Sequence, residues 1–255
     1  MTRLLEFNQI TRKFGVNAIL KGVNFDLFSK EIVALVGNNG SGKSTLLRIA
    51  AGLQPPSSGT VQLCEKDIQH MDFAVRAEKI TWVSAHTSES PGFSSMQFVA
   101  LAQERKRFAQ GRFAPSEAEL QHYMNCLQLF DAEHLAQRDL DKLSTGEWKR
   151  VQMARAWVNA TPVLLLDEPS NGLDVRHTAL LAERIRQYAQ HNSAAVLFSS
   201  HDFEFVSAIA SRIVILHEGL VIFNGAPSDV NRSELERVFG VPFREGLKPE
   251  YAIKA

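Results

Sequence analysis

The chain of 255 residues carries 28 basic and 28 acidic side chains, and its formal net charge is zero. Hydrophobic residues make up 45% and charged residues 22%, which is typical of a soluble globular protein and excludes a disordered chain. The balanced charge provides no overall positive field that would attract nucleic acid, so we expect no nucleic-acid partner.

Cysteine content and apolar runs indicate the compartment. Cys64 and Cys126 are the only cysteines, and neither lies at metal-ligand spacing from another Cys or His. Two separated thiols favour a reducing compartment over a disulfide framework. The first segment, MTRLLEFNQITRKF, shows no signal peptide, and no run approaches the ~20 apolar residues of a membrane-spanning helix. We expect a cytosolic chain that meets a membrane only through a partner.

The first part of the chain predicts strands followed by a helix. β-rich runs occupy residues 4–10, 23–28 and 31–36. Glycines follow the third run, and TLLRIAAGL after them has a helical pattern. A strand, a glycine loop and a helix in this order form the context that a phosphate-binding loop requires.

The rest of the chain predicts a helical insertion and a return to strands. Residues from about 95 to 160 are rich in Gln, Glu, Ala and Leu, which predicts helices. PVLLLD and AAVLFSS are apolar runs typical of buried parallel strands, with a helix expected over 178–190 between them. RIVILHEG and LVIFNG predict a hairpin with Gly219 near its turn. The sequence therefore predicts an α/β sheet domain interrupted by a helical subdomain and followed by a short helical tail.

The glycine loop matches the pattern G-x-x-x-x-G-K-[ST] in full. Its glycines let backbone amides turn towards phosphates, its lysine supplies a charge, and its serine hydroxyl can ligate Mg²⁺. The alternative is a glycine-rich turn that matches by accident, which at ~7% glycine usage is on the order of one in a hundred for such a chain. The ATP-binding residues predicted here are Gly37, Asn38, Asn39, Gly40, Ser41, Gly42, Lys43, Ser44 and Thr45.

Two carboxylates follow a buried strand. The apolar run before Asp167 delivers this residue to the edge of a sheet, where it can hold Mg²⁺ directly or through water. Glu168 comes next and can polarise the attacking water as general base. Alone, the pair could equally be a solvated acidic turn; together with the phosphate loop it predicts ATP hydrolysis, with Lys43 assisting and Ser44 as a second metal ligand.

Between these two motifs lies LSTGE, followed by the helix WKRVQMARAWV. The order of phosphate loop, LSTGE, LLLDEP, NGLD and a strand ending at His201 resembles the ATP-binding cassette (ABC) family, and the resemblance covers almost the whole chain. It implies a P-loop NTPase (RecA-like) core sheet with an N-terminal antiparallel β-subdomain. It also implies one ABC ATPase domain over residues 1–255, with the helical subdomain near 88–160 and the tail near 227–255.

The resemblance implies a head-to-tail dimer that holds ATP between the phosphate loop of one copy and the signature motif of the other. The signature role passes to Ser144, Thr145, Gly146 and Glu147, where Thr145 replaces the usual first glycine. These residues could also be an ordinary helix N-cap with a capping box, and both interpretations can hold.

Three further residues acquire roles from the resemblance. Asp174 matches a residue that communicates across the dimer, and His201 matches the switch histidine that contacts the γ-phosphate. A lone histidine after a strand is more often structural, so this role depends on the motif order. Phe14 lies where the family stacks an aromatic on adenine; the alternative is a core aromatic at a strand end.

The sequence departs from the family at one point. Ala85 stands where the family has a glutamine that reaches Mg²⁺ and moves with the transmembrane partner. His86 is adjacent and could substitute, although a solvated loop histidine is the simpler interpretation. The departure bears on hydrolysis rate and coupling more than on ATP binding.

The leading functional hypothesis is a transporter ATPase subunit, peripheral on the cytoplasmic face of the inner membrane. Its expected partners are a second copy, integral membrane permease subunits and, indirectly, a solute-binding protein. The helix that follows LSTGEW, together with the tail ELERVFGVPF, resembles the cassettes of iron–siderophore, haem and cobalamin importers. A soluble ABC ATPase, for example in iron–sulfur assembly, and a nucleotide-gated binding module remain as alternatives.

Overall fold

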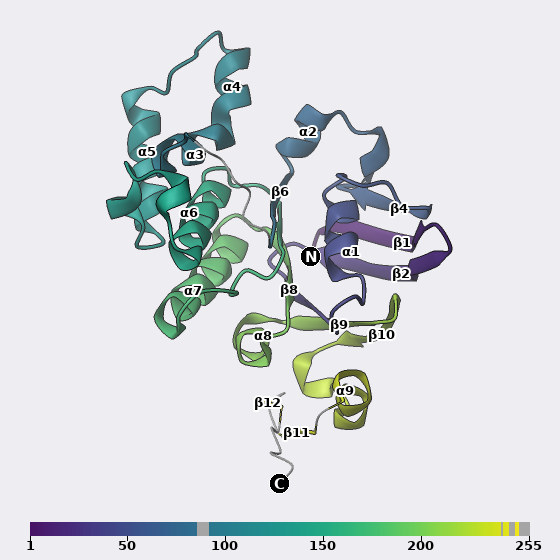
Figure 1. Ribbon diagram of the computed structural model, residues 1–255. Coiled ribbons are helices and arrows are strands. Elements are labelled where there is room, and N and C mark those ends of the chain that lie inside the picture. Colours follow the sequence, from purple (N-terminus) through teal and green to yellow (C-terminus); the bar gives the residue numbers. More distant parts are fainter. Residues whose placement is uncertain (86–91, 241, 245–247, 250–255) are drawn as a thin grey trace. The chain divides into compact units, whose positions relative to one another are not determined.

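The computed structural model describes residues 1–85, 92–240, 242–244 and 248–249 (Figure 1). The chain divides into two compact units. We call Met1–Trp82, Thr161–Pro169 and Ile185–Ala255 the sheet unit, and Val83–Ala160 with Ser170–Arg184 the helical unit.

An antiparallel sheet opens the sheet unit, in the strand order β2-β1-β4-β5. Its strands are β1 (Arg3–Phe14), β2 (Asn17–Phe28), β4 (Ser58–Leu63) and β5 (Lys66–Asp67). The first two strands are longer than their apolar runs because they pair with each other along almost their whole length. A register shift between Phe7 and Ile10, with Gln9 at φ 51°, interrupts the pairing of β1 with β2. The expected N-terminal antiparallel β-subdomain is confirmed.

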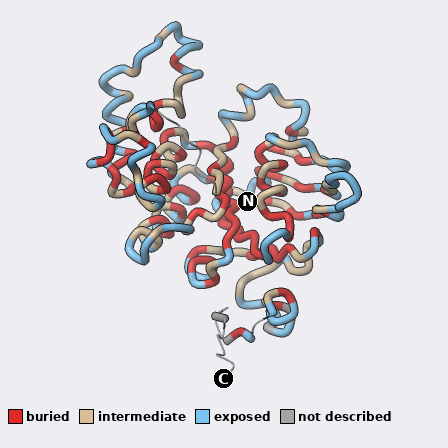
Figure 2. Tube along the Cα trace, viewed as in Figure 1, coloured by how far each residue is buried: buried red, intermediate tan, exposed pale blue. Residues whose placement is uncertain are grey.

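The core sheet has the strand order β10-β9-β3-β8-β7-β6. Its central pairs β9–β3, β3–β8 and β8–β7 are parallel, and β9 and β10 form the predicted antiparallel hairpin, with Gly219 at φ 81°. Figure 2 shows buried residues along the middle of this sheet, where β3, β7 and β8 are buried at every position, as expected for parallel strands covered on both faces. The bounds are β3 (Ile32–Val36), β6 (Ile80–Val83), β7 (Val163–Leu166), β8 (Ala195–Ser200), β9 (Arg212–His217) and β10 (Leu220–Gly225).

Helix α1 (Lys43–Ala50) joins the antiparallel sheet and the core sheet into one hydrophobic core. Leu46, Leu47 and Ile49 of α1 are fully buried in one cluster with Leu5 of β1 and Leu35 of β3. The remaining α-helices and strands of this unit are α2 (Phe73–Ala77), α8 (Phe203–Ile209), α9 (Arg232–Phe239), β11 (Phe243–Arg244) and β12 (Lys248–Pro249).

The helical unit contains the helices that the Gln-, Glu-, Ala- and Leu-rich segment predicts. Ser94 and Ser116 each begin a helix with a complete capping box. Phe98 packs on Trp148 with ring centroids 4.9 Å apart, and Tyr123 of the same unit is completely buried. The helices are α3 (Ser95–Ala100), α4 (Glu104–Ala109), α5 (Glu117–Gln128) and α6 (Thr145–Trp157); α7 (Val175–His191) continues from this unit into the sheet unit.

The topology brings three loops to one edge of the core sheet. Gly37 follows β3, Asp167 follows β7 and His201 follows β8, and these parallel strands are neighbours. The carboxyl ends of parallel strands meet at one edge, which is where ligands bind in open α/β sheets. In the described part of the chain, no helix has both the length and the apolar character needed to cross a membrane.

Candidate active site

The loop between β3 and α1 has a backbone that only glycine accommodates at several points. Gly40 and Gly42 have φ of 81° and 108°, in the region that other residues avoid. A Cβ on Gly37 would lie 2.1 Å from the backbone oxygen of Leu216 on β9. The glycines therefore allow both the curvature of the loop and its close approach to the sheet.

Lys43, the first residue of α1, extends back into this loop. Its Nζ donates to the backbone oxygens of Gly37 at 2.7 Å and Asn38 at 3.2 Å, and the residue is only 8% exposed. Burial lowers the pKa of Lys43, and the charges of Glu168 and Asp167 oppose that shift. A desolvated cation thus lies inside the loop, where an anion would gain more from it than in water.

A hydrogen-bonded cluster joins α1 to the ends of β7 and β8. Ser44 Oγ donates to Asp167 Oδ1 at 3.1 Å, and Asp167 is 2% exposed. Ser199 Oγ donates to the same oxygen at 2.6 Å and accepts from the backbone N–H of Glu168 at 2.9 Å. A hydroxyl oxygen and a carboxylate are the hard ligands that Mg²⁺ prefers, so the donor set predicted from the sequence fits this ion.

Ser199 is a site residue that the sequence analysis missed. It is completely buried near the end of β8, two positions before His201. The only signal was a pair of serines ending an otherwise apolar strand run, immediately before a histidine. Such polar residues at the carboxyl end of a buried strand indicate a site only once the neighbouring strand is known.

Glu168 and His201 are in direct contact. His201 Nδ1 lies 2.8 Å from Glu168 Oε2, with the carboxylate mostly buried and the imidazole largely exposed. An ionised carboxylate only accepts hydrogen bonds, so Nδ1 carries the proton of this contact. Glu168 also has φ 48°, a strained conformation for a residue with a side chain, of the kind that clusters at functional sites.

One further polar atom in the loop lacks a partner within the chain. Ser41 Oγ is buried, and it neither donates nor accepts a hydrogen bond among the described residues. A buried hydroxyl without a partner costs about 1–3 kcal/mol. Together with glycine amides and a buried ammonium, it makes a cradle whose chemistry fits a phosphate group.

The predicted signature residues begin helix α6 in the helical unit. Ser144 is the N-cap: its Oγ accepts from Glu147 N at 3.3 Å, and Glu147 Oε2 accepts from Ser144 N at 2.8 Å. Arg138 donates to Glu147 Oε1 at 2.9 Å. The backbone N–H of Ser144 holds the pKa of Glu147 below its usual range. The capping box expected from the sequence is therefore present.

Thr145 and Gly146 pack against the turn before α7. A Cβ on Gly172 would lie 2.9 Å from Thr145 Cγ2, and one on Gly146 would lie 3.0 Å from the Gly172 oxygen. Asp174 accepts from the backbone N–H of His177 at 2.8 Å and contacts its Nδ1 at 2.8 Å, and the backbone bond lowers the pKa of Asp174. Both motifs therefore belong to one packed region of the helical unit.

The remaining predicted positions make other contacts. Phe14 ends β1 and is 51% exposed. The guanidinium carbon of Arg12 lies over the Phe14 ring, 4.7 Å from the ring centroid. Ala85 is half-buried, and Gln152 of α6 donates to the oxygen of the preceding Ser84 at 3.2 Å. His86, the suggested substitute for the missing glutamine, lies outside the described residues.

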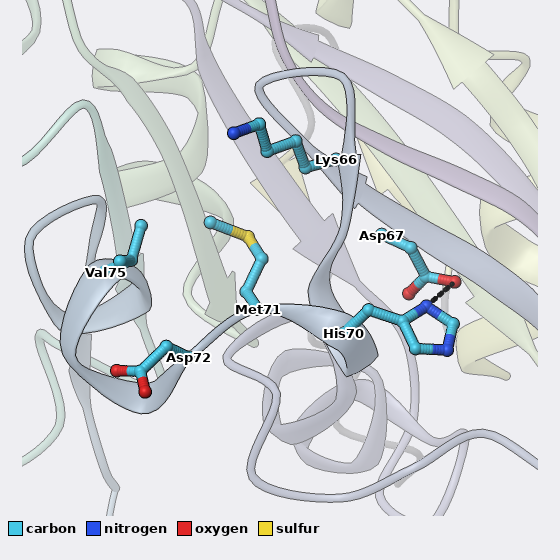
Figure 3. Close-up of a pocket in the computed structure, with 6 residues that line it drawn as sticks. All are labelled: Lys66, Asp67, His70, Met71, Asp72 and Val75. Atoms are coloured by element: carbon cyan, nitrogen blue, oxygen red, sulfur yellow. Dashed lines mark ion pairs between the residues drawn. The ribbon is translucent and has the colours of Figure 1, made fainter.

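A separate pocket of about 450 Å³ lies beside β5 and α2, and none of the predicted site residues lines it (Figure 3). Its carboxylates serve local structure. Asp67 accepts from the backbone N–H of Gln69 and lies 3.4 Å from His70 Nδ1, and Asp72 caps α2 through Ala74 N. We therefore place the candidate site at the phosphate loop.

Comparisons with known proteins agree with this assignment. Residues 20–171 match the model of a family described as ABC transporter. The chain is 33% identical to the hemin import ATP-binding protein HmuV of Hahella chejuensis, over 89% of this chain and 88% of that protein. It is 31% identical to the sulfate/thiosulfate import ATP-binding protein CysA of Photorhabdus laumondii, over 91% of this chain but only 63% of that longer protein.

A solved structure matches the fold. The chain is similar to the dimeric post-hydrolysis structure of the ATP-binding cassette MJ0796 bound to ADP and Pi, with TM-score 0.80 and 27% identity over 88% of this chain and 98% of that one. The family match covers more than half of the chain, and the core sheet, phosphate loop and helical unit agree with it. This chain belongs to the ABC transporter family and is one of its ATP-binding cassettes, the ATP-hydrolysing modules of that family.

Proposed function

We propose that this chain is the ATP-hydrolysing subunit of an ABC importer for a small solute. The observation that carries the proposal is the contact between Glu168 and His201 beside the phosphate loop, because it couples a candidate base to a residue that orients it. The two curated relatives are named as import ATP-binding proteins, one for hemin and the other for sulfate/thiosulfate. Both names support import, although they give different solutes. Within this proposal we favour a haem or metal chelate, because the chain covers most of HmuV.

The residues divide the work of hydrolysis among them. Loop amides from Gly37 to Thr45 and the Lys43 ammonium bind and polarise the β- and γ-phosphates. Glu168 accepts a proton from the water that attacks the γ-phosphorus as the bond to the ADP oxygen breaks. His201 holds the Glu168 carboxylate in position and would contact the γ-phosphate. Ser44 and Asp167 would hold Mg²⁺, which neutralises phosphate charge when bound.

The other half of the site comes, in this proposal, from a second copy of the chain. Ser144, Thr145, Gly146 and Glu147 begin α6, and a helix N-terminus with free amides favours an anion. The dimeric MJ0796 relative supports such an arrangement. Asp174 would communicate between copies and Phe14 would stack on adenine. The chain would act at the cytoplasmic face of the membrane with permease subunits, as one domain in which the helical region is an insertion.

The proposal is tested by Mg²⁺-dependent ATPase activity of the purified protein. Glu168→Gln removes the base and keeps the shape, so turnover should fall about 100-fold or more while ATP binding persists and a dimer accumulates. Glu78→Gln, an exposed carboxylate at the end of α2, is the matched control and should hydrolyse ATP normally. Wild-type turnover by Glu168→Gln would refute the general-base assignment.

The transporter role needs a separate measurement. Co-purification from detergent-solubilised membranes should recover an integral membrane protein in stoichiometric amount, and ATPase activity should respond to its presence. If the protein is fully active as an ATPase but no integral membrane protein co-purifies with it, the importer assignment is contradicted and a soluble ABC ATPase is favoured.

A further inference from the structure

The last described helix of the sheet unit contacts the phosphate loop directly. We call α9 and β11 the tail. Asn38 Nδ2 donates to the backbone oxygen of Val238 in α9, and Val238 and Leu235 are almost completely buried. The backbone oxygen of Asn38 accepts from Lys43 Nζ. Asn38 is thus held through its side chain by the tail and through its backbone by the phosphate-binding lysine.

The tail also contacts the segment that carries the switch histidine. Phe239 and Phe243 pack edge-on against Phe203, with ring centroids 5.0 and 4.9 Å away and interplanar angles of 90° and 76°. Phe203 begins α8 and follows His201 by two residues. Asp202 between them caps the same helix through the backbone N–H groups of residues 204 and 205. Moving the aromatic cluster would therefore move the start of α8.

The tail depends on these contacts for its own order. Helix α9 has eight residues, fewer than an isolated helix needs in water, although Asn231 caps its start and Gly240, at φ 70°, ends it. Short elements of this kind dock and undock at a lower free energy than the core of a domain. The docked state of α9 is thus linked to Asn38 and Phe203.

We propose that the tail is a positioning element for the nucleotide site, so that tail docking and nucleotide binding favour each other. Docking fixes Asn38 and the start of α8, and the loop then no longer has to be ordered when nucleotide binds. Because linkage is reciprocal, bound nucleotide stabilises the docked tail by the same factor. This proposal rests on the proposed function, since it needs nucleotide at the phosphate loop.

Three variants test the link. Asn38→Ala removes the donor to Val238, Phe239→Ala removes one ring of the aromatic cluster, and the double variant removes both. Each single variant should weaken equilibrium binding of a fluorescent ATP analogue by about three- to tenfold, the loss of one hydrogen bond or ring contact. The double variant should bind the ATP analogue no more weakly than the single variant with the lower affinity, because both changes disrupt the same coupling between the tail and the nucleotide site. Phe239→Leu should retain most of the affinity.

The control variant and a second readout separate positioning from simple destabilisation. Phe130→Leu in the helical unit alters a similar edge-on contact, with Trp157 at 4.9 Å and 80°, and should leave nucleotide affinity within about twofold of wild type. Amide hydrogen exchange in α9 should slow on adding the ATP analogue to wild type, and less so in Asn38→Ala.

The outcomes are distinguishable. Three results would each overturn the positioning role. The first is a loss of nucleotide affinity in the double variant that equals the product of the two single losses, and the second is wild-type affinity in both single variants. The third is amide hydrogen exchange in α9 that does not change when nucleotide is added. A wild-type protein that does not bind the analogue would refute the proposed function and this coupling together. Wild-type binding that the tail variants leave unchanged would refute only the coupling.

Discussion

Removing the Ser199 hydroxyl should damage stability and catalysis together. Ser199→Ala deletes the 2.6 Å bond to Asp167 Oδ1 and leaves the Glu168 backbone N–H without its 2.9 Å acceptor, in a place with no exposure to solvent. A hydrogen bond to a charged group contributes about 1.5–3 kcal/mol and a neutral one about 0.5–1.5 kcal/mol. We therefore expect the free energy of unfolding to fall by about 2–4 kcal/mol.

Part of this loss should appear in turnover. Asp167 keeps its Ser44 contact, but Glu168 loses the backbone bond that stabilises its strained φ of 48°. If about 1.4 kcal/mol of the loss applies to the transition state, kcat falls tenfold, with a smaller effect on KM. Steady-state ATPase assays and chemical denaturation measure the two effects.

The matched control is Ser211, which bonds the first residue of β3, at the end of that strand away from the phosphate loop. Ser211 Oγ donates to the oxygen of Ile32 at 3.0 Å and accepts from its N–H at 3.2 Å, so Ser211→Ala also removes two hydrogen bonds in the sheet unit. It should lower stability by less, because Ser211 is exposed and its partners are neutral, and it should leave kcat unchanged. Equal effects of the two variants on unfolding and on kcat would refute the reasoning.

Three further predictions follow from single groups. Lys43→Ala should weaken ATP binding by about 30-fold, about 2 kcal/mol for lost charge-assisted bonds, and equilibrium titration showing unchanged affinity would contradict the phosphate-loop assignment. The bond from Arg112 lowers the pKa of Glu119 to about 2, so the ionised carboxylate stabilises the fold above its ordinary pKa of 4.5, and this effect is lost as the pH falls towards 2. Glu119→Gln should therefore flatten the pH dependence of the free energy of unfolding between these two values. An unchanged pH dependence would argue against the Arg112–Glu119 pair. Burial raises the pKa of the Cys126 thiol to about 11, so iodoacetamide at pH 8 should label the half-buried Cys64 first, and faster labelling of Cys126 by mass spectrometry would contradict its burial.

Features fixed by local sequence were predictable. The phosphate loop needs a strand, glycines and a helix in immediate succession, and the structure has β3, Gly37 and α1 in that order. The hairpin of β9 and β10 and the helix of residues 175–191 follow from equally local patterns. The family resemblance, which rested on motif order, is confirmed by the comparisons.

Features that depend on strand neighbours were not predictable. Ser199 bonds Asp167 because β8 lies beside β7 in parallel register, with Leu166 opposite Phe198, and the next residues on each strand then meet. The strand order places β3 on the other side of β8, which no local pattern encodes. The contact of Asn38 with Val238 spans 200 residues and is equally invisible in the sequence.

The capping box narrows what the signature motif can offer to a second copy. Glu147 Oε2 already accepts from the backbone N–H and hydroxyl of Ser144, and Oε1 accepts from Arg138. An ionised carboxylate so engaged has no reason to turn towards a negatively charged phosphate. In the proposed dimer, the groups left to bind the partner's nucleotide would be the helix N-terminal amides near Thr145 and Gly146, which carry the positive end of the α6 dipole. Thr145 then acts less as a ligand than as a packing residue, because its methyl group fits the space that Gly172 leaves open. The threonine that stands in place of the family's usual glycine thus packs inside the chain, against the turn that leads to Asp174.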